Sequence, residues 1–311
     1  MRIRPANSRP RAADDHGFIV VAVLWILGAL AALLSIYAVF VVDTANALGA
    51  HDDRLRSEAL VSAAVELTAY RLTAATVSRP THGQFSFRIG KSNVEVDFRS
   101  EAARIDLNVA PKETLAGLFA TLGASPDAAN SYAKRVIGWR TPPASDPDPE
   151  ASAYRAAGLR YAPRGGRFPH VNELSLVLDL PAALVERAMP FVTVHSGRPQ
   201  VNVLDAAPEV IAALPGMTVA RLNSVLAQRR ATPGNRELLL SLLGPAKDYA
   251  TAEGGKAIRV NVRIALDNGR QTGAEVVILM FDQGSEPYSV LSWRDEWEQL
   301  PSDDRGWKWR Q

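Results

Sequence analysis

The longest apolar run of the chain lies near its beginning, from Gly17 to Val42, and contains no charged residue. As a helix rising about 1.5 Å per residue it is roughly 39 Å long, enough to cross a hydrocarbon layer of about 30 Å. The pattern therefore predicts a membrane-spanning helix over residues 18–42. A cleavable secretory signal is the alternative, but its apolar core has only about 7–15 residues and ends at a small-residue cleavage site. No such site closes this run.

Charged residues before the apolar run predict the orientation of the membrane helix. They are four arginines and two aspartates: Arg2, Arg4, Arg9, Arg11, Asp14 and Asp15. Under the positive-inside rule this end of the chain stays in the cytoplasm, so the remainder is delivered across the membrane.

Helix-favouring residues continue beyond the apolar run, and no proline occurs between Arg11 and Pro80. We therefore expect one helix of more than about fifty residues, the spine helix, over residues 18–75. A break at Gly49, giving two separate helices, is the alternative. An apolar stripe at steps of three and four residues predicts the face that packs on the following domain, namely Leu55, Ala59, Ala63, Leu67 and Tyr70.

Alternating apolar and polar positions, together with one continuous apolar run at residues 274–281, predict strands on both sides of a helix-patterned middle, residues 105–250. The predicted strands are residues 85–89, 94–98, 258–264, 274–281 and 287–293, and the first two form a hairpin around residues 90–93. Strands at both ends with helices between them predict an α+β fold. Its small antiparallel sheet is drawn from residues 76–104 and 256–295, with a large inserted helical domain between them.

The helical middle contains an internal repeat, because residues 105–118 superpose on residues 201–214, 96 positions later. Each copy is an extended apolar stretch, a polar cap and a helix opened by proline and glutamate, which suit a helix start. A second helix follows in each copy, so we expect two helical subdomains, residues 105–200 and 201–250. In the second copy a helix-hairpin-helix turn is predicted at Leu214, Pro215, Gly216 and Met217.

Composition excludes several classes of function. The 35 Lys and Arg residues nearly balance the 33 Asp and Glu residues, which argues against binding of nucleic acid through bulk positive charge. The absence of cysteine excludes disulfides, thiolate zinc sites, iron–sulfur clusters and cysteine nucleophiles. None of the five histidines stands in a metal-ligand spacing, and no catalytic constellation is found, so we predict that the protein is not an enzyme.

Three carboxylates at alternate positions of a proline-rich loop form a candidate calcium site: Asp146, Asp148 and Glu150. Calcium prefers 6–8 oxygen ligands, and these three residues supply only some of them. The alternative is a solvated acidic loop.

The end of the chain, residues 296–311, is rich in tryptophan. Trp297, Trp307 and Trp309 lie in it, and Trp293 comes just before it. Together with nearby basic residues they suit a protein-contact patch. A frayed tail is the alternative.

The start of the apolar run resembles the processing site of type IV prepilins and pseudopilins, in which a glycine precedes phenylalanine and an unbroken apolar helix. This resemblance implies that prepilin peptidase cuts between Gly17 and Phe18 and removes residues 1–17 as a leader.

The repeated phrases and the hairpin, in this order, resemble the general secretion pathway protein K family of type II secretion minor pseudopilins. The resemblance implies a pilin-like fold carrying two sterile-alpha-motif-like subdomains, and some members bind calcium. It further implies a single-pass protein of the bacterial inner membrane with most of its chain in the periplasm. The implied partners are pseudopilins of the I and J type, the major pseudopilin and the inner-membrane secretion platform. Where the family often has Asn-Thr, this chain has Leu204-Asp205, so Asp205 is expected to cap the following helix.

Ala22 stands at the fifth position after the implied cleavage site, where most pilins and pseudopilins have glutamate. That carboxylate offsets the buried α-amino charge of a neighbouring subunit, which saves several kcal/mol. A subunit that lacks it suits the tip of a pseudopilus, where it caps the fibre and helps to initiate assembly. A non-assembling membrane anchor is one alternative. Another is a membrane-tethered DNA receptor that uses the hairpin and its arginines, although we expect no nucleic-acid partner.

Overall fold

In a computed structural model, the described residues are 16–75, 79–143, 148–232, 235–283 and 286–296. The chain divides into two compact units, Met1–Glu58 and Ala59–Gln311. Helix α1 (His16–Thr73) begins in the first unit and ends in the second. It contains 58 residues and continues through Gly49, which confirms the predicted single spine helix.

The first unit consists, where it is described, of the N-terminal part of α1. A 25-residue segment, Val20–Thr44, has a mean hydropathy of 2.5 and the length of a membrane span. Its large apolar side chains are exposed, with Trp25 at 77% and Phe40 at 65% of their full area. Such a surface suits a hydrocarbon environment, which agrees with the predicted membrane helix.

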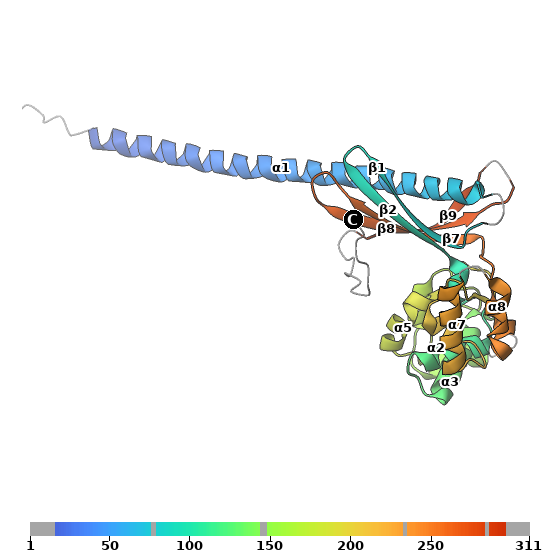
Figure 1. Cartoon of the computed structure of the whole chain (residues 1–311). Helices are drawn as coiled ribbons and strands as arrows, with labels where there is room; N and C mark the ends of the chain where they lie inside the picture. The colour runs from blue at the N-terminus through green and yellow to red at the C-terminus, as the bar shows by residue number, and fades with distance from the viewer. Residues whose placement is uncertain (1–15, 76–78, 144–147, 233–234, 284–285, 297–311) are drawn as a thin grey trace, which may run out of the picture. The chain divides into compact units, whose positions relative to one another are not determined.

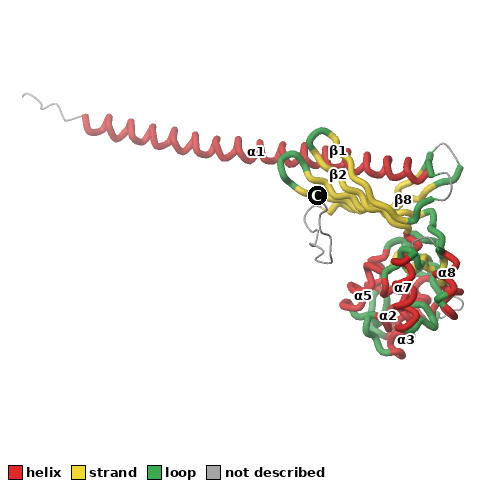
Figure 2. Tube along the Cα trace, in the orientation of Figure 1, coloured by secondary structure: helices red, strands yellow, loops and turns green. Residues whose placement is uncertain are grey.

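The second unit contains a five-stranded antiparallel sheet in the order β1-β2-β7-β8-β9 (Figures 1 and 2). Its strands are β1 (His82–Ile89), β2 (Ser92–Ser100), β7 (Ala257–Ala265), β8 (Gln271–Met280) and β9 (Tyr288–Glu296). The predicted hairpin joins β1 to β2, and Gly90 supplies the positive φ of +61° that the tight turn requires. Strands from both sides of the helical middle therefore form one sheet, as predicted.

Within the second unit, α1 packs on one face of the sheet (Figure 1). The buried side chains of this part of the helix are Leu60, Val61, Ala64, Val65, Thr68, Ala69 and Leu72. The predicted stripe was therefore wrong: Tyr70 is 70% exposed and Leu55 is 52% exposed. The helix carries two neighbouring stripes of apolar residues, and the sheet covers the one with more aliphatic area.

The chain between β2 and β7 forms the helical insertion, which lies next to one end of the sheet (Figure 1). Its longer helices are α2 (Lys112–Thr121), α3 (Pro126–Arg140) and α7 (Val219–Ala231). The shorter elements are η1 (Glu101–Ala103), β3 (Ile105–Asp106), α4 (Pro149–Ala156), η2 (Val171–Leu176), α5 (Ala182–Ala188), η3 (Met189–Phe191), β4 (Val192–Thr193), β5 (Val201–Asn202), α6 (Pro208–Ala212), α8 (Arg236–Ser241), η4 (Gly244–Tyr249) and β6 (Ala250–Thr251). One hydrophobic cluster extends from Ile105 to Ala250, so the two predicted subdomains share a core that is separate from the core of the sheet.

The sequence repeat is also a repeat of structure. Strand β3 pairs in parallel with β4, and β5 pairs in parallel with β6. In each copy the last residue of the first strand accepts a hydrogen bond from the backbone N–H two residues later, Asp106 from Asn108 at 2.7 Å and Asn202 from Leu204 at 3.0 Å. Each copy thus begins with the same turn into a helix and closes with a short returning strand.

The first helices of the two copies meet at equivalent positions. A side chain on Gly117 of α2 would place its Cβ 1.9 Å from the backbone oxygen of Ala213, which follows α6. Gly117 and Ala213 are matched residues of the repeat, 96 positions apart. The two copies therefore pack closely around this point, and glycine is the residue that permits the contact.

Candidate functional site

The predicted processing site lies in the first turn of α1, which begins at His16 and includes Gly17 and Phe18. Of the predicted leader, residues 1–15 lie outside the described residues. Ala22 follows in the same helix and is partly exposed. The structure places these residues in the apolar helix, and the cleavage itself stays a prediction.

The predicted calcium loop is only partly described, because Asp146 lies outside the described residues. Asp148 caps α4 by accepting hydrogen bonds from the backbone N–H groups of Glu150 at 3.1 Å and Ala151 at 3.3 Å. Glu150 forms an ion pair with Arg135 at 3.1 Å. Within the described part of the chain no group of three His, Asp or Glu side chains is arranged to hold a metal ion. Calcium binding stays a prediction, and two of its three proposed ligands have structural partners.

The predicted hairpin turn, Leu214–Met217, joins α6 to α7. The Met217 N–H donates to the Leu214 carbonyl at 3.0 Å, and Gly216 has a φ of +76°. The carbonyl of Gly216 accepts a hydrogen bond from Arg221 at 2.8 Å. One of the arginines considered for DNA contact is therefore bonded to the turn itself.

The predicted contact patch near the chain end is largely outside the described residues, which stop at Glu296 before Trp297. Trp293 lies in β9, is 37% exposed and donates from its ring N–H to Asp295 at 2.6 Å. The structure therefore describes one of the four tryptophans, at the edge of the sheet.

Two arginines hold the starting turns of the repeat, a role that no pattern in the sequence indicates. Arg140, at the end of α3, donates to the carbonyls of Leu107 and Ala110, the latter at 2.8 Å. Arg229 in α7 donates to the carbonyls of Val203 at 3.3 Å and Ala206 at 2.7 Å. The four acceptors are matched pairs of the repeat, so each copy uses an arginine of its second helix to satisfy the same two backbone oxygens.

A buried charge cluster joins the insertion to the sheet. Arg259 of β7 is paired with Glu101 of η1 through distances of 2.6 Å (Nε to Oε1) and 3.0 Å (Nη2 to Oε2). Arg259 also pairs with Glu275 of β8, which in turn pairs with Arg294 of β9. The hydroxyl of Thr193 in β4 donates to Glu101. The cluster thus connects three strands of the sheet to the start and the returning strand of the first repeat.

The pKa values in this cluster follow from burial and pairing. Burial opposes ionisation of Glu101, but its hydrogen bond to Arg259 and the nearby positive charges lower the pKa of its carboxyl below the usual value. Burial likewise opposes ionisation of Glu275, while Arg259 and Arg294 together lower its pKa to about 2. Both carboxylates are therefore ionised at neutral pH. Arg259, which pairs with both of them, has a raised pKa despite its burial.

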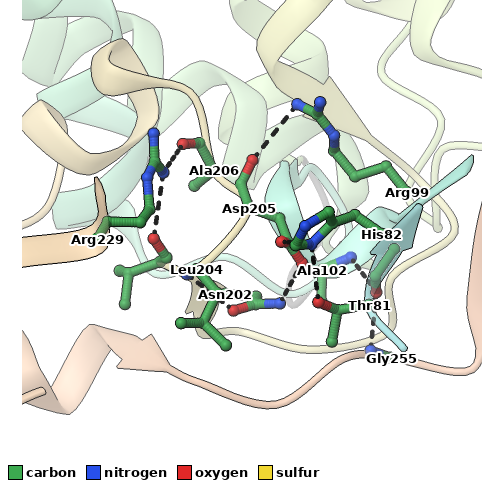
Figure 3. Close-up of polar contacts among 12 residues, drawn as sticks. Thr81, His82, Arg99, Ala102, Asn202, Leu204, Asp205, Ala206, Arg229 and Gly255 are labelled. Atoms are coloured by element: carbon green, nitrogen blue, oxygen red, sulfur yellow. Dashed lines mark hydrogen bonds and ion pairs between the residues drawn. The ribbon is translucent and has the colours of Figure 1, made fainter. Parts of the chain in front are cut away.

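A second polar cluster connects the sheet to the second repeat (Figure 3). Nδ1 of His82 in β1 lies 2.6 Å from Oδ1 of the buried Asp205, and this oxygen atom has no other partner among the described residues. The side-chain amide of Asn202 donates to the other oxygen of Asp205 at 2.8 Å. The expected helix cap by Asp205 was wrong, because α6 begins after Ala207 without a side-chain cap. The carboxylate instead binds a histidine of the sheet.

Residues of the two clusters carried weak signals in the sequence. Arg259 occupies a polar position of an alternating strand, and Glu275 interrupts a strand that is otherwise apolar. The structure covers this part of the sheet with the insertion, so Arg259 is 7% exposed. Glu101, directly after β2, had no distinguishing pattern at all.

Residues 97–197, which include the whole first repeat from β3 to β4, match the family model for protein K of the type II secretion system. Over this segment the chain is similar to protein K of the type II secretion system. No curated protein sequence gives a significant match. The fold is similar to that of a chain in the crystal structure of the GspK-GspI-GspJ complex from the enterotoxigenic Escherichia coli type 2 secretion system. The TM-score is 0.58 at 16% sequence identity, over 79% of this chain and 98% of that chain. The chain thus has an α+β, pilin-like fold with an N-terminal apolar helix.

Proposed function

We propose that this protein is a protein K of the type II secretion system, which caps the tip of a periplasmic pseudopilus and helps to start its assembly. The observation that carries this placement is Ala22 in the apolar helix, where the fifth mature position of most pilins holds a carboxylate. Inside a fibre, each subunit offers that carboxylate to the α-amino group of a neighbour, because an unpaired buried charge costs several kcal/mol. A subunit at the tip needs to offer no such group, so alanine is tolerated there.

The insertion supports the same placement. It is built between two neighbouring strands of the sheet, β2 and β7, and has its own hydrophobic core. The two polar clusters fix it to the sheet through buried ion pairs and hydrogen bonds. A domain of this bulk, connected to the sheet by these contacts, is hard to accommodate between laterally packed subunits, whereas the end of a fibre leaves room for it.

The partners we propose are the I-type and J-type minor pseudopilins, since the structurally similar chain comes from a GspK-GspI-GspJ complex. The major pseudopilin and the inner-membrane secretion platform follow as partners of the assembling fibre. Prepilin peptidase acts first and cuts between Gly17 and Phe18. The arginine-rich start of the chain stays in the cytoplasm, and Ala59–Gln311 functions in the periplasm as a structural component.

Processing and assembly are tested separately. N-terminal sequencing of the membrane-extracted chain from cells with active prepilin peptidase is expected to begin at Phe18, and a Gly17→Ile variant is expected to retain Met1. Co-expression with the I-type and J-type pseudopilins of the same cell is expected to give a stable complex. A cysteine at position 22 is then expected to crosslink only to subunits below it in the fibre. Crosslinks that place position 22 beneath another subunit midway along a fibre contradict the tip placement.

A further inference from the structure

A small cavity lies where the sheet meets the first repeat, beside the buried charge cluster. Its volume is about 100 Å³, and its charged and titratable lining residues are Arg104, Arg259, Arg294, His170, His195 and Glu275. A water molecule takes about 30 Å³ of liquid volume, so the space suits a few waters or one group of carboxylate or phosphate size.

Positive charge is in excess around this cavity. Arg259 is paired with Glu101 and Glu275, and Arg294 shares Glu275. Arg104 has no hydrogen bond or ion pair from its guanidinium to any described residue, and only longer-range attraction to these two carboxylates. Three arginines therefore face two carboxylates, which leaves one positive charge without a matching negative charge.

The charged form of the Arg104 guanidinium is destabilised at this position. Burial lowers the pKa of its guanidinium to about 10, and repulsion from Arg259 acts in the same direction. A guanidinium carries five N–H donors in a planar fork, which fits the two oxygens of a carboxylate or phosphate. An oxyanion in the cavity supplies both the missing charge and the missing acceptors.

The two histidines of the cavity are compatible with an anion. Nδ1 of His170 accepts a hydrogen bond from the Asn172 N–H at 3.1 Å, so in the neutral ring Nε2 carries the proton and is a donor. Burial lowers the pKa of His195, so this ring contributes as a neutral group at neutral pH. The lining of the cavity therefore presents hydrogen-bond donors to an anion. Glu275 is the one carboxylate in the lining, and it is already paired with two arginines.

We propose that this cavity is a binding site for one small oxyanion of the carboxylate or phosphate class, held by Arg104 at the junction of sheet and insertion. The bound anion neutralises the surplus arginine and strengthens the connection between the first repeat and β7–β9. The anion is either a free ion of the periplasm or a carboxylate presented by another polypeptide. The site itself does not depend on the proposed tip placement.

The direct test is isothermal titration of the full chain in detergent with inorganic phosphate and with acetate, at constant ionic strength against chloride. We expect saturable binding at one site per chain. In Arg104→Gln the dissociation constant is expected to rise at least about tenfold, the loss of one charge-assisted hydrogen bond. The matched control is Arg187→Gln on α5, an exposed arginine that does not line the cavity, which is expected to bind as the wild type does.

A measurement on the wild type keeps the proposal testable if Arg104→Gln does not fold. Phosphate is expected to slow amide hydrogen exchange around the cavity, in β4 and in the segment that contains Arg104, more than in β1. No saturable binding, or equal binding by Arg104→Gln and Arg187→Gln, overturns the proposal. Equal slowing of exchange throughout the second unit overturns it as well.

The source of the anion is decided with the I-type and J-type pseudopilins present. If their complex with this chain no longer binds phosphate at the cavity, a carboxylate of a partner occupies the site. If the complex binds phosphate as the isolated chain does, the natural ligand is a free anion. Both results require that the cavity beside Arg104 binds an anion, and they differ only in the source of that anion.

Discussion

Replacing Glu275 by glutamine tests how strongly the buried charge cluster stabilises the second unit. The side chain is 14% exposed and pairs with both Arg259 and Arg294. Glu275→Gln keeps the shape of the side chain but removes its charge, so Arg259 retains only Glu101 and Arg294 loses its partner. The variant is expected to be less stable at neutral pH.

The magnitude follows from the pKa of Glu275. Pairing lowers it from the ordinary 4.5 to about 2, and one pKa unit corresponds to about 1.4 kcal/mol. The lowered pKa means that this stabilisation is fully present above pH 4.5 and is lost as the pH falls towards the folded-state value. We therefore expect Glu275→Gln to cost about 3 kcal/mol at pH 7, and roughly half as much or less at pH 3.

The assay is urea unfolding of the full chain in detergent at pH 7, 4.5 and 3, followed by tryptophan fluorescence. The matched control is Glu186→Gln, which changes an exposed glutamate of α5. This control is expected to shift the free energy of unfolding by less than about 0.5 kcal/mol at each pH. A cost for Glu275→Gln that is the same at pH 7 and pH 3 refutes the reasoning, because its loss then does not follow the ionisation of the carboxylate.

Four further substitutions test contacts of the insertion by thermal unfolding of the full chain. Arg140→Met and its repeat counterpart Arg229→Met each leave two carbonyls without their donor, so each is expected to cost about 2–3 kcal/mol; a negligible cost in either contradicts the shared role. Gly117→Ala places a Cβ 1.9 Å from the backbone oxygen of Ala213 and is expected to cost more than about 2 kcal/mol of unfolding free energy. The control Gly49→Ala, which has open space around it, is expected to be neutral or slightly stabilising. His82→Ala removes the partner of the buried Asp205 and is expected to cost about 1–3 kcal/mol of unfolding free energy. The same substitution is expected to cost little in a chain that already carries Asp205→Ala. Additive costs of the two substitutions contradict direct pairing of the side chains.

The strands and the long helix were predictable because their periodicity is local. The alternation around Gly90 was sufficient to predict the β1–β2 hairpin, and uninterrupted helix-favouring residues were sufficient for α1. The face of α1 was not predictable to the same degree. Leu60 and Leu67 lie on neighbouring stripes, and only the sheet, which is formed by residues far along the chain, determines that Leu60 is the buried one.

The candidate site illustrates the same division. The repeat was visible in the sequence because residues 105–118 and 201–214 share a pattern. The arginines that complete it were not, since Arg140 and Arg229 lie outside the matched segments and at different distances from them. Asp205 was expected to act locally as a cap, but it binds His82, which is more than a hundred positions earlier.

By itself, the sequence determined the apolar spine helix, the alternating strands, the repeated helical insertion and the absence of a carboxylate at Ala22. These properties depend on neighbours within a few residues, where backbone preference and apolar periodicity act directly. Only the tertiary structure decided which charges are buried. Arg259 and Glu101 are 158 positions apart and approach each other because the insertion covers one end of the sheet. Burial makes their charges costly unless they are paired, and this pairing over a long sequence distance has no local pattern from which it can be predicted.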